Sequence, residues 1–153
     1  MKTVLIIDAD PGSSSLAEVL QRHGFRGIAA PNASKSLAIV REDPSIALVV
    51  TEMQLPDMDG LHFLIAIRAL APGLPVIVVT SSVSIESYLH AVNLGVYEYL
   101  NKPVPPKELA RIASLALAGP WTVPPLRESS RPSGLTANLA QPHRGGAAEA
   151  PDR

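Results

Sequence analysis

The chain has 153 residues, in which 13 lysines and arginines nearly balance 14 aspartates and glutamates to give a formal charge of -1 with histidine neutral. This balance supplies no electrostatic attraction to nucleic acid or to an anionic membrane. The sequence contains no cysteine, which excludes a disulfide framework, a thiolate metal site and a cysteine nucleophile, and no apolar run approaches the roughly 18 residues that span a bilayer. We therefore expect a cytoplasmic protein that binds neither nucleic acid nor membranes.

The composition changes near Gly119, which divides the chain into two parts. Residues 120–153 contain six prolines and a single aromatic residue, Trp121, among small and polar side chains. Such a segment buries too little apolar surface to offset the entropy of ordering. We predict one domain over residues 1–119 and a disordered, proline-rich C-terminal tail over residues 120–153.

Strand and helix patterns alternate along the first 119 residues. Runs rich in β-branched residues predict strands at 3–7, 26–30, 46–51, 76–80 and 96–100. Amphipathic stretches follow them, with predicted starts at Ser13-Ser14-Ser15, Asn32, Asp59, Ser84 and Pro105-Pro106. In the stretch after Ser84, the apolar face is predicted from Ile85, Leu89 and Val92. This (βα)5 alternation predicts an α/β fold with a doubly wound, five-stranded parallel sheet.

Charged and hydroxyl side chains follow the predicted strands at their carboxyl ends. Asp8 and Asp10 follow the first strand, Glu52 follows the third, Thr80 ends the fourth, and Lys102 follows the fifth. Ligands of doubly wound sheets bind beyond these ends, so we expect the five residues to lie together. Strand logic alone leaves two interpretations open, which are a self-neutralising cluster of ion pairs and a phosphate or metal site.

Four segments carry a resemblance to a known family. They are Val4–Asp8, Glu52–Gly60, Pro75–Thr80 and Gly95–Pro103. Together they resemble the receiver domain of two-component response regulators, across essentially all of residues 1–119. The resemblance implies a flavodoxin-like sheet of order 2-1-3-4-5, two adjacent acids that hold Mg²⁺, an aspartate that accepts a phosphoryl group from a kinase histidine, and a Lys-Pro bond that is typically cis.

The resemblance also implies roles for individual residues. Thr80 and Lys102 correspond to the residues that contact the phosphoryl oxygens, and Tyr99 corresponds to the switch aromatic, which reports the signalling state by rotating. Receivers usually bind partners or dimerise through the face formed by helix 4, strand 5 and helix 5. On that basis we predict that Tyr88 and Tyr97 lie on a partner surface, with a homodimer as one possibility.

Two positions depart from the family pattern. Glu52 stands where the family has its acceptor aspartate, and Ala9 stands where it has the second Mg²⁺-binding acid. The remaining candidate ligands, Asp8, Asp10, Glu52 and the carbonyl of Gln54, form at most a weak magnesium site, because Mg²⁺ demands near-octahedral oxygen coordination. We expect no tight metal and no other cofactor.

Three hypotheses follow for the function. The leading one is a pseudo-receiver, a module without enzyme activity that binds a sensor kinase, an effector or an output protein and is held in one state by a Glu52 to Lys102 contact. The second is an ordinary response regulator in which Asp10 replaces Ala9 and another acid accepts the phosphoryl group, Asp57 being nearest in sequence. The third is a small flavodoxin-like enzyme that binds a phosphorylated ligand.

Overall fold

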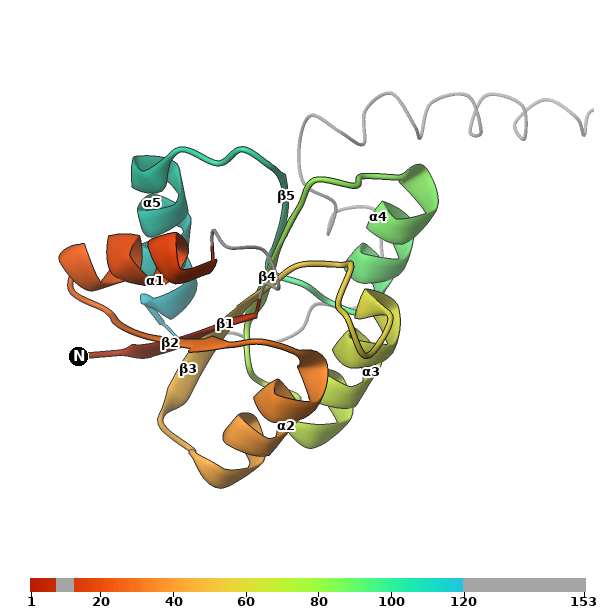
Figure 1. Ribbon diagram of the computed structural model, residues 1–153, viewed down its shortest axis with the longest axis horizontal. Helices are drawn as coiled ribbons and strands as arrows, with labels where there is room; N and C mark the ends of the chain where they lie inside the picture. Colours follow the sequence, from red (N-terminus) through yellow and green to blue (C-terminus); the bar gives the residue numbers. More distant parts are fainter. Residues whose placement is uncertain (8–12, 120–153) are drawn as a thin grey trace, which may run out of the picture.

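The computed structural model describes residues 1–7 and 13–119 (Figure 1). The predicted acids Asp8 and Asp10 and the predicted tail 120–153 lie outside the described residues. The elements are β1 (Thr3–Ile7), α1 (Ser13–Arg22), β2 (Arg26–Ala30), α2 (Ala33–Glu42), β3 (Ile46–Thr51), α3 (Gly60–Leu70), β4 (Val76–Thr80), α4 (Ile85–Asn93), β5 (Glu98–Asn101) and α5 (Pro106–Leu117). Within these residues, no helix is both long and apolar enough to cross a bilayer.

The five strands form one parallel sheet in the order β2-β1-β3-β4-β5, which is the expected order. All five positions of both β1 and β4 are buried, because helices cover both faces of the sheet. Helices α1 and α5 pack on one face, and α2, α3 and α4 pack on the other (Figure 1). The predicted doubly wound α/β architecture is therefore confirmed.

The first four strands have their predicted bounds, whereas β5 begins two residues later than predicted. Gly95 ends α4 with a positive φ of 76°, which glycine adopts without strain. The amide of Val96 then donates to the carbonyl of Ala91 at 3.3 Å and so belongs to the end of the helix. Since this amide caps α4, the regular ladder with β4 starts only at Glu98.

The predicted buried face of α4 is right for Val92 but wrong for Ile85 and Leu89. Its buried residues are Tyr88, Ala91 and Val92, whereas Ile85 is 56% exposed and Leu89 is 41% exposed. Both sets of residues have helical spacing, but the tyrosine ring removes more surface from water and takes the inner side. The prediction that Tyr88 lies on a partner surface is therefore corrected, because this side chain is fully buried.

The carboxyl ends of the strands meet at one edge of the sheet, and this edge positions the candidate site. Glu52 directly follows β3, Thr80 is the last residue of β4, and Lys102 directly follows β5. Neighbouring strand ends are joined by backbone hydrogen bonds, from Glu52 to Ile7 at 3.1 Å and from Lys102 to Thr80 at 2.9 Å. The Lys102-Pro103 bond is cis, as the resemblance implied.

Candidate functional site

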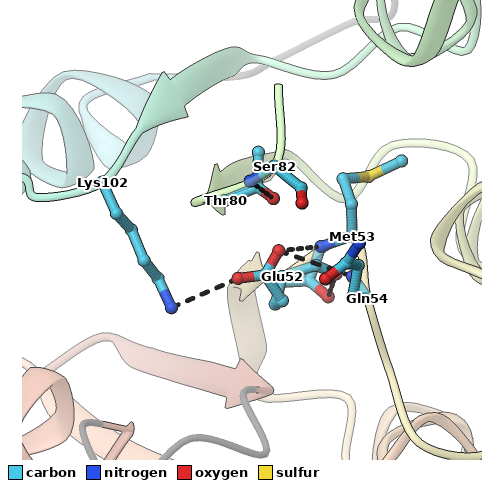
Figure 2. A network of polar contacts seen from close by, with 7 residues as sticks. Glu52, Met53, Gln54, Thr80, Ser82 and Lys102 are labelled. Carbon is cyan, nitrogen blue, oxygen red and sulfur yellow. Dashed lines mark hydrogen bonds and ion pairs between the residues drawn. The ribbon is translucent and has the colours of Figure 1, made fainter. Parts of the chain in front are cut away.

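Glu52 carries the only acidic side chain that is buried among the described residues. Its Oε1 lies 3.2 Å from the Nζ of Lys102, and the two side chains are 7% and 21% exposed (Figure 2). Its Oε2 accepts hydrogen bonds from the amides of Met53 at 2.8 Å and Gln54 at 3.4 Å. A buried carboxylate is costly unless it is paired and hydrogen-bonded, and here both oxygens have donors. The structure thus brings Glu52 and Lys102 together.

Thr80 lies on the neighbouring strand end and is fully buried. Its Oγ1 accepts a hydrogen bond from the amide of Ser82 at 3.1 Å, which shapes the start of the β4–α4 connection. Figure 2 shows Thr80 and Ser82 beside Glu52, but the hydrogen bonds of Glu52 do not include one to Thr80. The site therefore joins Glu52 to the lysine and leaves the threonine hydroxyl engaged with its own loop.

Of the four candidate magnesium ligands, the structure describes only Glu52 and Gln54. Among the described residues, no group of three acidic, histidine or cysteine side chains could hold a metal. Both oxygens of Glu52 accept from the ammonium of Lys102 or from backbone amides. A metal at this carboxylate would share its oxygens with these donors, and we derive no reaction step through a metal.

The loop after Glu52 is tied to α2 by Asp57. The two oxygens of Asp57 accept from the amides of Ala33 and Ser34, each at 3.0 Å, at the first turn of that helix. These hydrogen bonds, the one from Ala33 first, lower the pKa of Asp57, and the positive end of a helix dipole favours the same charge. Both carboxylate oxygens of Asp57 are therefore used to cap α2, which argues against Asp57 as a phosphoryl acceptor.

The same loop is closed by a close backbone approach. The amide of Gly60 donates to the carbonyl of Met53 at 3.0 Å, and a Cβ on Gly60 would clash with the backbone of Met53. Gln54 and Asp59 form an isolated antiparallel bridge inside the loop, and the Asp59 carboxylate accepts from the amide of Leu61 as the N-cap of α3. These contacts fix the two amides that hold Glu52.

The three tyrosines occupy different environments. Tyr99 on β5 is 6% exposed, and burial raises its pKa, with the charge of Glu52 raising it further. Tyr88 on α4 meets the Tyr99 ring edge to face. Tyr97 is half-buried and packs against the core on the α5 side. The charge of Glu52 therefore acts on Tyr99, and Tyr97 packs in a different core cluster from Tyr88 and Tyr99.

Sequence reasoning missed several of these contacts. The amides of Met53 and Gln54 carry no side-chain signal, and Asp57 binds a helix end 24 residues away. The pairing of Tyr88 with Tyr99 had one available signal, the clustering of all three tyrosines within twelve residues. Only the fold decides which of the three face one another.

Comparisons with known proteins identify the family. The model of the response regulator receiver domain matches residues 4–114. The chain is 30% identical over 102 residues to the transcriptional regulatory protein GlrR of Escherichia coli (strain K12), which covers 66% of this chain and 23% of that protein. The chain thus spans about a quarter of that relative's length.

Solved structures agree with this match. A CheY-like receiver domain protein from Methanospirillum hungatei JF-1 is 30% identical, with a TM-score of 0.74, over 77% of this chain and 94% of that chain. A beryllofluoride-activated NtrC4 receiver domain, solved as a dimer, is 28% identical with a TM-score of 0.72 over 77% and 98% of the two chains. The chain therefore belongs to the family of response regulator receiver domains, the signalling modules of two-component systems.

Proposed function

We propose that this chain is a phosphorylation-independent receiver, a pseudo-receiver that acts by binding another protein. The observation that carries the proposal is the ion pair between Glu52 and Lys102, at 3.2 Å in a largely buried site. In this interpretation the Glu52 carboxylate supplies a permanent negative charge to the lysine that otherwise contacts a phosphoryl group. A carboxylate carries -1, whereas a phosphoryl group carries about -1.5 to -2, so the substitution is partial.

Three features support the loss of phosphotransfer. Phosphoryl transfer depends almost wholly on positioning and electrostatic stabilisation, and the side chain of Ala9 offers no oxygen to a metal. The extra methylene of Glu52 moves its carboxylate, and misplacement on the order of 1 Å can cost roughly a hundredfold in rate. The carboxylate is also already bound by Lys102 and two amides, which lowers its nucleophilicity.

Restoring aspartate at positions 9 and 52 tests this proposal. The single variants Ala9→Asp and Glu52→Asp and their combination are incubated with acetyl phosphate and Mg²⁺, and acid-labile phosphate is measured. Because metal and nucleophile act as a unit, we expect labelling only in the double variant. Strong labelling of either single variant would contradict the proposed pair of defects.

The partner surface is proposed to lie on α4. The side chains of Val83, just before α4, and of Ile85 and Leu89 on it are exposed and apolar, and we call them the α4 strip. The dimer formed by the NtrC4 receiver makes a second copy one candidate partner, beside a sensor kinase, an effector or an output protein. A cytoplasmic location belongs to the same proposal.

A charged substitution tests the α4 strip. Leu89→Arg places a charge on an exposed position, so we expect nearly unchanged melting but weaker partner binding or a shift of the protein towards monomer. Ile65→Arg is the matched control, because Ile65 is 52% exposed on the neighbouring helix α3. Equal effects of the two substitutions would contradict a contact surface on α4.

A further inference from the structure

Helix α4 is attached to β5 by a pair of aromatic rings. Tyr88 points from the buried side of α4, and its ring meets the Tyr99 ring with centroids 5.4 Å apart and an interplanar angle of 87°. Edge-to-face geometry of this kind is favourable for two aromatic rings. Both rings belong to the core cluster on the α2, α3 and α4 side of the sheet. The pair therefore connects α4 to the strand that leads into Lys102.

Tyr99 lies between this ring contact and the candidate site. Its hydroxyl is buried and has no hydrogen-bond partner among the described residues. Burial, and after it the charge of Glu52, raises the pKa of the phenol. Since no hydrogen bond to a described residue orients the hydroxyl, ring packing in the core, including the contact with Tyr88, holds Tyr99 in place.

A second attachment fixes the C-terminal end of α4. The Arg68 guanidinium, which comes from α3, donates to the carbonyls of Leu94 at 3.0 Å and Gly95 at 3.2 Å, where α4 ends. It also donates to the carbonyls of Leu74 at 2.7 Å and Pro72 at 3.2 Å in the α3–β4 connection. The last carbonyls of a helix lack partners within the helix, so Arg68 satisfies groups that otherwise need water. One side chain thus joins α3, the following loop and the end of α4.

We propose that Tyr88 and Arg68 are positioning residues that fix α4 on the domain, so that the α4 strip and Tyr99 keep one arrangement relative to the sheet. Two contacts support this, because Tyr88 meets the Tyr99 ring on β5 and Arg68 donates to backbone carbonyls at the end of α4. The inference deepens the proposed function, and it rests on that function only in treating the α4 strip as the contact surface.

Hydrogen exchange and a phenol titration test the proposal on the full chain. Amide exchange of α4 is compared with that of α1 by NMR, and the pKa of Tyr99 is followed through its ring signals, in the variants Tyr88→Ala and Tyr88→Phe. Leu89→Ala is the matched control, because it truncates an exposed neighbour on the same helix. Neither readout needs a phosphoryl donor or a partner, so their failure is distinguishable from failure of the proposed function.

We expect Tyr88→Ala to accelerate exchange in α4 about tenfold relative to α1, and to lower the pKa of Tyr99 because water reaches the phenol. Tyr88→Phe retains the ring, so both readouts should stay within about twofold of the unmodified chain, as they should in Leu89→Ala. Tyr88→Leu is measured in parallel, because it fills more of the space and keeps the chain folded if alanine does not. It should also lower the pKa of Tyr99.

Two results would overturn the proposal. The first is a folded Tyr88→Ala or Tyr88→Leu variant with unchanged α4 exchange and an unchanged Tyr99 titration. The second is Arg68→Lys with unchanged exchange at the end of α4, since lysine keeps the charge but loses the fork of donors that binds several carbonyls.

Discussion

Replacing Lys102 by alanine should leave the buried charge of Glu52 without its ion-pair partner. Removing one partner of a fully buried ion pair costs about 3–5 kcal/mol, whereas an exposed pair contributes about 0.2–1 kcal/mol. The Lys102 side chain is 21% exposed and Glu52 keeps two amide donors, so this pair lies between the two limits. We expect Lys102→Ala to lower the free energy of unfolding by about 1.5–3 kcal/mol.

A double-mutant cycle isolates the contribution of the pair, because Lys102 takes part in a further interaction. Urea unfolding is measured for Lys102→Met, Glu52→Gln and the combination of both. The combination removes both charges, so it should be more stable than the sum of the single losses predicts. Lys107→Ala on α5 is the control, since an exposed lysine should change stability by less than about 0.5 kcal/mol.

Additive effects of the substitutions at Lys102 and Glu52 on the free energy of unfolding would refute the predicted coupling. If Lys102→Ala changes stability as little as Lys107→Ala does, or if the two substitutions at the site add without coupling, the carboxylate of Glu52 does not depend on the lysine. The proposed permanent charge at Lys102 would then have no energetic support.

Further predictions concern the loop and the aromatic pair. The pKa of Asp57 is lowered, so its contribution to stability is present above the unfolded pKa of about 3.9 and is lost as the pH falls through the folded pKa. In Asp57→Asn, the free energy of unfolding measured with urea should therefore fall less steeply at acidic pH. Gly60→Ala should destabilise the domain by about 1–3 kcal/mol in urea, because its Cβ meets the Met53 backbone. Tyr99→Phe removes a buried hydroxyl with no partner among the described residues, so its melting temperature should stay unchanged or rise.

The sequence was informative where local composition dominates. Apolar runs rich in β-branched residues predicted β1, β3 and β4 with their observed bounds, because such runs are typical of strands buried in a parallel sheet. The meeting of Glu52 with Lys102 was also predictable, since residues after neighbouring parallel strands share one edge. Asn32, Asp59 and Ser84 cap the helices that follow them, as predicted.

The sequence was less informative where two local solutions compete. In α4, both apolar stripes have helical spacing, and the sequence does not show that Tyr88 turns inward to pack in the core beside the Tyr99 ring. The start of β5 depends on the amide of Val96, which the end of α4 uses. Asp57 binds amides 24 residues away, and no local pattern encodes such a contact.

The measurement that tests the central claim most directly is intact-mass analysis of the unmodified chain after incubation with acetyl phosphate and Mg²⁺. The account predicts no acid-labile phosphoryl adduct on this chain under conditions in which the Ala9→Asp, Glu52→Asp double variant is labelled. A strong adduct on the unmodified chain, retained when Glu52 is changed to glutamine, would contradict the account and show that another acid accepts the phosphoryl group.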